Sequence, residues 1–240
     1  YFGDTGRVPY GTRSRETIIK YALQDIAFLR SQNVKMIIAA CGTVSAALPQ
    51  DMVNQFDFYY SSVLLPAAQA ACVQSKTGKI GVIATQASIK SGAYGKAMRT
   101  IRPDAKVIGN ACPLFVPLVE NGFIDRANPV TRMVAEQYLK PFINNVDTLI
   151  LGCTHYPILK ELIADILGDD ITLINPGTET ARQTRALLTK QNMLHEKDGG
   201  GNYHYYVSDN IESFSAIGSI CLGKEIIGDV QFVSVDGLNV

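Results

Sequence analysis

The chain has 240 residues, which suffices for one large domain or for two lobes of about 100 residues each, and 47% of its residues are hydrophobic. Its 22 Lys and Arg residues balance 22 Asp and Glu residues, so the sequence lacks the overall positive charge that attracts nucleic acid or an anionic membrane. We therefore expect a small-molecule partner, and neither nucleic acid nor a membrane.

Membrane and cysteine signals indicate the compartment. No apolar run approaches the roughly 20 residues that span a bilayer, and the first residues show no signal-peptide pattern. The five cysteines are an odd number without C-x-x-C spacing, which favours free thiols in a reducing compartment and argues against a zinc site. We expect a cytoplasmic protein without a bound metal.

The first third of the chain reads as a loop followed by alternating helices and strands. The opening segment is rich in glycine and turn formers, and Thr12 or Ser14 is a candidate cap for the helix that follows. A continuous apolar run at 34–40 is typical of a parallel strand buried on both faces. In chain order we expect a loop at 1–14, a helix at 15–31, a strand at 34–40, a helix at 44–54, an extended stretch at 58–65 and a helix at 66–74.

The remaining two thirds continue this alternation. Segment 113–121 is apolar and carries one acid, Glu120, while 198–202 reads D-G-G-G-N and is typical of a surface loop. Strands that alternate with helices indicate the α/β class with mainly parallel sheets. In chain order we expect a strand at 80–84, a helix reaching 100, a strand at 106–111, a helix at 129–144, a strand at 148–151, a helix at 157–167, a strand at 171–175, a helix after 176, a strand at 204–207, a helix at 210–221 and a strand at 231–235.

Two stretches share a design in which a cysteine follows a buried strand. Residues 36–46 read M-I-I-A-A-C-G-T-V-S-A, and residues 148–157 read T-L-I-L-G-C-T-H-Y-P. Open α/β sheets place their ligand sites at the carboxyl ends of parallel strands. Cys41 and Cys153 are therefore candidate acid/base groups, with His155 near enough in sequence to exchange a proton with Cys153. One such unit would also fit a buried structural cysteine, but its repetition favours catalysis.

The repeat predicts two pseudo-symmetric α/β lobes with the active site in the cleft between them and one thiol on either wall. We assign residues 1–64 and 178–240 to the first lobe and residues 65–177 to the second. One thiolate would remove a proton from a substrate carbon and the opposite thiol would protonate the other face, which inverts the configuration. Counting back along the repeat also predicts that a first strand of the first lobe precedes Tyr1.

The thiols need a suitable environment, because an ordinary cysteine has a pKa near about 8.5 and is mostly protonated at neutral pH. Cys41 and Cys153 each precede a predicted helix start, where backbone N–H groups favour the thiolate. The other cysteines, Cys72, Cys112 and Cys221, lie in apolar surroundings, so we expect them to pack in the core.

Several motifs together resemble those of a known family. They are Y-F-G-D-T-G-R-V-P-Y-G-T-R-S at 1–14, I-I-A-A-C-G-T-V-S-A at 37–46, G-V-I-A-T-Q-A-S-I-K-S-G-A-Y at 81–94, C-P-L-F-V-P-L-V-E at 112–120, G-C-T-H-Y-P at 152–157 and Y-V-S-D at 206–209. With these motifs the chain resembles the glutamate racemases of the aspartate/glutamate racemase superfamily over essentially its whole length.

This resemblance implies racemisation of L-glutamate to D-glutamate without a cofactor, for peptidoglycan synthesis, by a homodimer. Cys41 and Cys153 match the two catalytic bases of the family. His155 matches the residue that assists the second base, and Glu120 matches an acid near that histidine. The positions that match substrate-binding residues are Tyr10, Gly11, Thr43 and Thr154. Backbone N–H groups and hydroxyls at such positions would stabilise the negative charge that develops next to the substrate carboxylate.

Two departures from the family pattern leave other functions open. Gly42 follows the first cysteine where the family usually has asparagine, and the D-S-G motif with its assisting aspartate does not occur in this chain. The alternatives are a racemase of aspartate or another amino acid, and a non-catalytic homologue that binds an amino acid or a protein partner. A decarboxylase of the same superfamily is disfavoured because both cysteines are present.

Overall fold

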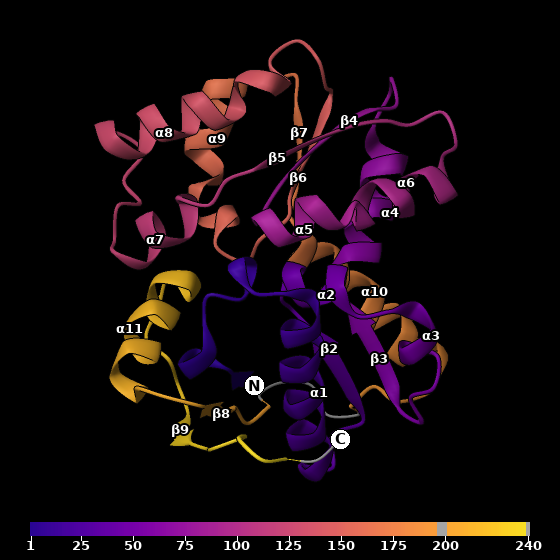
Figure 1. Ribbon diagram of the computed structural model, residues 1–240, viewed down its shortest axis with the longest axis vertical. Helices are drawn as coiled ribbons and strands as arrows, with labels where there is room; N and C mark the ends of the chain where they lie inside the picture. The colour runs from indigo at the N-terminus through magenta and orange to yellow at the C-terminus, as the bar shows by residue number, and fades with distance from the viewer. Residues whose placement is uncertain (196–200, 239–240) are drawn as a thin grey trace.

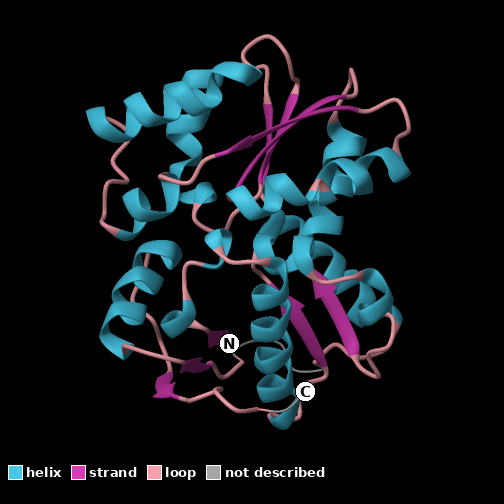
Figure 2. Ribbon diagram, in the orientation of Figure 1, coloured by secondary structure: helices cyan, strands magenta, loops and turns pink. Residues whose placement is uncertain are grey.

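The computed structural model describes residues 1–195 and 201–238, which form three parallel sheets with helices packed around them (Figures 1 and 2). The largest sheet lies in the upper half of Figure 1, and the two smaller sheets lie in the lower half. The strands are β1 (Phe2–Gly3), β2 (Met36–Ala39), β3 (Tyr59–Ser62), β4 (Lys79–Ala84), β5 (Lys106–Ala111), β6 (Thr148–Leu151), β7 (Thr172–Ile174), β8 (His204–Val207) and β9 (Asp229–Phe232).

Helices alternate with these strands, as the sequence predicted. The α-helices are α1 (Arg15–Ser31), α2 (Gly42–Ala47), α3 (Gln50–Val53), α4 (Leu64–Gln74), α5 (Gln86–Ser91), α6 (Ala93–Ile101), α7 (Phe115–Glu120), α8 (Pro129–Leu139), α9 (Lys160–Leu167), α10 (Pro176–Lys190) and α11 (Ile211–Leu222). Short 3-10 turns are η1 (Thr5–Arg7), η2 (Tyr10–Thr12), η3 (Lys140–Phe142) and η4 (Tyr156–Leu159). The fold is therefore α/β, as expected.

The largest sheet has the strand order β5-β4-β6-β7, and all its pairings are parallel. Helices cover both faces of its central strands β4 and β6. Successive side chains of a strand point to opposite faces and therefore pack against different helices. Leu149 and Leu151 pack into the cluster with α7, α8 and α9, whereas Ile150 packs into the cluster with α4 and α6. This explains why both strands are continuous apolar runs in the sequence.

The smaller sheets pair β2 with β3, and β1 with β8 and β9. Among the described residues, β2 has a strand partner on one edge only. The upper and lower sheets agree with an arrangement of two lobes, while the residue bounds assigned above to each lobe stay a prediction. Within residues 1–195 and 201–238, no helix combines the length and the apolar character needed to cross a bilayer.

Two predicted helices are each divided in two. The helix expected at 44–54 is interrupted between α2 and α3, where Leu48 is extended and Pro49 follows. This fits the restriction that a proline imposes on the residue before it. The helix that reaches residue 100 breaks at Gly92, whose φ of 66° places it in the left-handed region that ends α5. Ser14 caps α1 as predicted, since its side chain accepts a hydrogen bond from the Thr17 N–H.

The prediction that the opening segment is only a loop is wrong, because β1 pairs in parallel with β8. Phe2 lies opposite Tyr206 in this pairing. A two-residue strand is too short to show a periodic pattern. Local sequence patterns therefore could not predict that this segment pairs with β8, which lies near the other end of the chain. Of the surface loop predicted at 198–202, residues 198–200 lie outside the described part of the chain.

Asp147 secures the start of β6. Its carboxylate accepts hydrogen bonds from the Ser75 hydroxyl at 2.6 Å, the Thr77 N–H at 2.7 Å and the Thr148 hydroxyl at 2.9 Å. Partial burial raises the pKa of Asp147, but the hydrogen bonds outweigh it and lower this pKa to about 2. The carboxylate thereby ties the entrance of β6 to the turn before β4.

We expect Asp147→Asn to lower the melting temperature by about 2–4 °C at pH 7, the equivalent of roughly 1 kcal/mol for a partly exposed carboxylate in a chain of this size. Because the folded-state pKa is depressed, the stabilisation is present above about pH 4 and is lost as the pH falls towards 2. Thermal melts of both proteins between pH 2 and pH 7 test this. The control is Asp169→Asn, at an exposed acid. Equal melting temperatures of the wild type and Asp147→Asn at pH 7 would contradict the prediction.

Candidate active site

The two cysteines singled out in the sequence occupy equivalent places in the fold. Cys41 follows β2 by two residues and directly precedes α2, and Cys153 follows β6 by two residues. Both thiols are free and partly exposed. The repeat recognised in the sequence therefore corresponds to a repeated structural unit, with a thiol at the carboxyl end of a parallel strand in each case.

The cysteine-bearing segments approach each other closely at two glycines. A Cβ atom built on Gly42 would lie 2.3 Å from the carbonyl oxygen of Gly152, far inside any normal contact. A Cβ atom on Gly152 would in turn lie 2.8 Å from the carbonyl oxygen of Ile83. Glycine at both positions thus allows the end of β2 to rest directly against the end of β6, which brings the residues after Cys41 beside those before Cys153.

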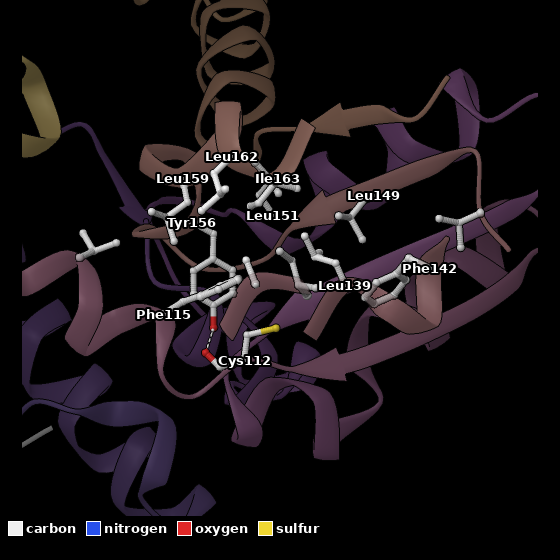
Figure 3. Packing of buried hydrophobic residues seen from close by; sticks show 14 residues of the cluster. Cys112, Phe115, Leu139, Phe142, Leu149, Leu151, Tyr156, Leu159, Leu162 and Ile163 are labelled. Atoms are coloured by element: carbon white, nitrogen blue, oxygen red, sulfur yellow. Dashed lines mark hydrogen bonds between the residues drawn. The ribbon is translucent and has the colours of Figure 1, made fainter. Parts of the chain in front are cut away.

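Tyr156 anchors the segment that carries Cys153 (Figure 3). Its side chain is fully buried, and its hydroxyl donates a hydrogen bond to the carbonyl oxygen of Cys112 at 2.8 Å. Its ring packs edge-on against Phe115, with ring centroids 5.2 Å apart. Because Phe115 begins α7 and Glu120 ends it, the same packing fixes the position of Glu120.

Cys153, His155 and Glu120 form a chain of polar contacts. The Sγ atom of Cys153 lies 3.8 Å from Nδ1 of His155, and Nε2 of His155 lies 3.1 Å from Oε1 of Glu120. Thr154 is beside them, with its hydroxyl 3.3 Å from the same Nδ1. With the hydrogen on Nε2 donated to Glu120, the imidazole presents a lone pair to the thiol. The arrangement can carry a proton between Cys153 and the carboxylate.

Hydroxyl groups gather between the predicted substrate-binding residues. The Thr43 and Thr85 hydroxyl oxygens are 2.9 Å apart, and Thr85 is 3.0 Å from the hydroxyl of Ser88. Gly11 lies against them, since a Cβ built there would be 2.8 Å from Cβ of Thr85. The structure therefore brings Gly11 and Thr43 together, although 31 residues, including helix α1 and strand β2, separate them in the chain.

Tyr10 is placed differently from the other predicted binding residues. Its side chain is buried, and its hydroxyl donates a hydrogen bond to Asp4 and lies 3.2 Å from a carboxylate oxygen of Asp25. Its ring lies 5.8 Å from the ring of Tyr21 in α1. The hydroxyl of Tyr10 is thus engaged within the protein, and this residue holds the η2 turn against α1.

Burial controls the protonation of both thiols. It raises the pKa of Cys153 to about 12 and also raises the pKa of Cys41. Backbone N–H groups of Thr43 and Val44 lower the pKa of Cys41, as its place before a helix predicted, but they do not offset burial. A negative charge on Cys41 raises the pKa of Cys153 further, so a state with one thiolate and one thiol is favoured over two thiolates.

A cavity of about 650 Å³ opens beside the junction of the two strand ends. Cys153, Thr154 and Gly42 line it, together with the first turn of α10 and the last residues of α11. Its volume suits a small molecule. Among the described residues, no group of three or more His, Cys, Asp and Glu side chains is arranged to hold a metal ion.

The structure adds residues that the sequence reasoning missed. Thr85 follows β4 directly and so lies at the carboxyl end of a parallel strand, as Cys41 and Cys153 do two residues after theirs. Tyr94 has a buried hydroxyl without a hydrogen-bond partner among the described residues, 3.8 Å from a Cβ built on Gly42. Both cysteines, when charged, raise the pKa of Tyr94, so its hydroxyl lies near both thiols. Tyr94 lies in the motif at 81–94, but no role was assigned to it from the sequence.

The expectation of core packing is correct for Cys72 and Cys112, which are buried, and wrong for Cys221, which is exposed. The reason is that no residue of α11 is buried, although the helix is apolar. Hydrophobic composition therefore misled the prediction at this helix. Cys221 instead lines the cavity together with Cys153.

Comparison with known proteins identifies relatives that cover nearly the whole chain. A sequence model of the Asp/Glu/Hydantoin racemase family matches residues 2–184. The curated glutamate racemase of Geobacter metallireducens is 40% identical over 237 residues, covering 98% of this chain and 87% of that protein. The glutamate racemase of Chlorobaculum parvum is 45% identical over 238 residues, covering 98% of this chain and 86% of that protein.

Solved structures agree with these sequence matches. The crystal structure of a glutamate racemase from Bacillus anthracis has a TM-score of 0.90 at 33% identity, covering 99% of this chain and 87% of that one. The glutamate racemase of Francisella tularensis in complex with D-glutamate has a TM-score of 0.89 at 37% identity, covering 98% of this chain and 87% of that one. On the family match and these full-length similarities, the chain belongs to the Asp/Glu/Hydantoin racemase family.

Proposed function

We propose that this protein interconverts L-glutamate and D-glutamate without a cofactor, using Cys41 and Cys153 as the two acid/base groups. The observation that carries the proposal is the contact between Gly42 and Gly152, which joins two strand ends that each bear a thiol. Relatives at 40% and 45% identity named glutamate racemase, and a similar structure with bound D-glutamate, support glutamate as the substrate.

In one direction of the proposed reaction, the Cys41 thiolate takes the proton from the α-carbon and becomes a thiol. The electron pair stays on the substrate as a carbanion next to the carboxylate. The Cys153 thiol then gives its proton to the opposite face of that carbon and becomes a thiolate. The reverse direction exchanges the roles of the two cysteines, and charge and protons balance in both.

The substrate would be held by the groups that gather around the thiols. Gly11, Thr43 and Thr154 would donate hydrogen bonds to its charged ends, with Tyr10 holding the η2 turn in place. Donors aimed at the carboxylate stabilise the carbanion because negative charge builds up there in the transition state. Repulsion between two thiolates favours the state in which one cysteine is a thiolate and the other a thiol. This is the state that the reaction requires.

His155 and Glu120 would restore the protonation of Cys153 between turnovers. The relay would return a proton to the Cys153 thiolate after one direction of the reaction and remove it before the other. Since burial raises the pKa of Cys153 to about 12, its proton needs an acceptor before the thiolate can serve as a base. Nδ1 of His155 is 3.8 Å from the sulfur, and Glu120 stabilises the imidazolium that would form. Cys41 has no comparable relay among the described residues.

We expect His155→Asn to lower kcat by about 100-fold and Glu120→Gln to lower it by about tenfold, because general acid–base assistance typically contributes factors of this order. Both substitutions should also shift the pH–kcat profile to higher pH. This shift should be larger for His155→Asn, because that substitution removes the proton acceptor itself. Steady-state racemisation between pH 6 and pH 10 measures both effects. The control is Glu136→Gln, on the outward face of α8. If His155→Asn and Glu120→Gln both kept the wild-type kcat and pH profile, the relay would be refuted.

Circular dichroism of L-glutamate incubated with the protein tests the activity itself. The signal should decay to zero as the mixture reaches equal amounts of both enantiomers. A flat trace at ample protein concentration would overturn the proposal. The same assay with aspartate and with other amino acids tests the alternative racemase activities, and binding of glutamate without decay would favour the non-catalytic homologue.

The proposal extends to the role of the product. D-Glutamate made in the cytoplasm would supply peptidoglycan synthesis, and the protein would act as a homodimer. Growth of a D-glutamate-requiring bacterial strain that expresses this chain tests the first point. Sedimentation equilibrium tests the second, since a monomer at micromolar concentration would exclude a stable homodimer.

A further inference from the structure

A partly buried ion cluster lies beside the η2 turn. Arg7 is 11% exposed, and its guanidinium donates to Asp4 at 2.7 Å and to Asp25 of α1 at 2.7 Å. A third hydrogen bond, of 2.6 Å, goes to Oε1 of Gln24. The guanidinium carbon also lies 4.2 Å from the centroid of the Tyr21 ring. All the guanidinium nitrogens thus have partners, which fix the η1 segment onto α1.

The cluster is connected to the proposed substrate site through Tyr10. The Tyr10 hydroxyl lies within hydrogen-bond distance of both carboxylates of the cluster, with the shorter contact to Asp4 and one of 3.2 Å to Asp25. Gly11 is the next residue and rests against Thr85, which is hydrogen-bonded to Thr43. A shift of the cluster would therefore move Gly11 relative to the hydroxyl groups around the thiols.

The cluster contains two carboxylates and one guanidinium, so its fully ionised form carries one net negative charge in a partly buried place. The charged or titratable groups that face Asp25 are Asp4, Arg7, Tyr10 and Cys41. Ser208 of the β8–α11 loop donates to Asp4 at 2.7 Å and adds no charge. Burial and the charge of Asp4 raise the pKa of Asp25 to about 7, against the opposing effect of Arg7.

We propose that the Asp4–Arg7–Asp25 cluster is a positioning device for Tyr10 and Gly11, with Asp25 as its protonation-sensitive member. The inference rests on the proposed racemase function. It assigns no contact with substrate to Arg7 or Asp25. They act through Tyr10 and Gly11, and through the charge that Asp25 places near Cys41.

Protonation of Asp25 changes both the hydrogen bonds and the charge of the cluster. A neutral Asp25 donates its proton to the Tyr10 oxygen, while the Tyr10 hydroxyl donates to Asp4 and every group is satisfied. An ionised Asp25 competes with Asp4 for the single Tyr10 proton. It also adds negative charge near an anionic substrate and raises the pKa of Cys41. Substrate binding should therefore weaken as the pH rises through about 7.

Asp25→Asn isolates this effect, because an amide has the shape of the carboxyl group and resembles its neutral form. Its oxygen can accept from Arg7 while its nitrogen donates to Tyr10. We expect the KM of the wild-type protein for glutamate to rise about fivefold between pH 6 and pH 8, as one partly screened charge would produce. The KM of Asp25→Asn should stay constant over this range. Its pH–kcat profile should shift to lower pH, because Cys41 then lacks the nearby charge of ionised Asp25.

A second readout does not depend on activity. Because the folded-state pKa of Asp25 lies above its ordinary value, its stabilising contribution is present below about pH 4 and is lost as the pH rises to about 7. The melting temperature of the wild type relative to Asp25→Asn should therefore fall between pH 4 and pH 7 and stay level above pH 7. Asp57→Asn, at an exposed acid paired with Arg30, should show neither effect.

The outcomes separate this inference from the proposed function. A wild-type protein that racemises glutamate, with identical KM–pH profiles in wild type and Asp25→Asn, would overturn the positioning role of Asp25 alone. A wild-type protein that neither binds nor racemises glutamate would overturn the proposed function and this inference with it. A KM step near pH 7 in the wild type that Asp25→Asn removes would establish the role.

Discussion

Cys41→Ser and Cys153→Ser should each lower the racemisation of glutamate by at least about 1000-fold. A serine hydroxyl keeps the size of the thiol, but it is far less acidic and cannot act as the base at an accessible pH. Both cysteines are needed because each serves one face of the α-carbon. The decay of the circular dichroism signal of L-glutamate measures the loss, and Cys72→Ser, at a buried cysteine outside the site, is the control.

Proton exchange in heavy water gives a sharper readout of the same variants. A variant with one remaining thiol can still remove and return a proton on the face that this thiol serves. Cys41→Ser should therefore exchange the α-proton of one enantiomer of glutamate, and Cys153→Ser that of the other, without inversion. NMR of the α-proton follows the exchange. Racemisation at the wild-type rate in either variant, or exchange of both enantiomers by one variant, would contradict the two-base mechanism.

Gly42→Ala should lower kcat/KM by about 100-fold, which is the size of effect that a displacement of about 1 Å has on reacting groups. The added Cβ would lie 2.3 Å from the carbonyl oxygen of Gly152, and both are fixed to backbone, so the two strand ends must separate. Overpacking of this kind also costs about 1–3 kcal/mol of folding free energy. Steady-state kinetics and thermal melts measure the two effects.

The matched control for this substitution is Gly201→Ala, because no atom of residues 1–195 or 203–238 lies within 4 Å of a Cβ built at Gly201. Gly42→Asn, which introduces the residue usual in the family, meets the same contact with Gly152 and should be impaired as well. Wild-type activity in Gly42→Ala would show that the strand ends tolerate separation. It would also remove the main structural support for a fixed distance between the two thiols.

The sequence was informative where local patterns decide structure. Buried strands appear as continuous apolar runs because helices cover both faces of β4 and β6, so these strands and the α/β class could be predicted. The cysteines after β2 and β6 were recognisable because the repeat preserves their spacing from a strand end. Helix boundaries at Leu48 and Gly92 were missed, since interruption by a turn leaves the apolar spacing nearly unchanged.

The sequence by itself determined the alternation of strands and helices after residue 14, apart from the breaks at Leu48 and Gly92, together with the two strand–cysteine units and the family. Only the tertiary structure decided how these parts meet. The contact of Gly42 with Gly152, the link from His155 to Glu120 and the cluster of Arg7 with Asp25 join residues that are far apart in the chain. Side-chain packing and backbone approach fix such distances, and local periodicity records only which residues are apolar, so their geometry is set by the folded chain as a whole.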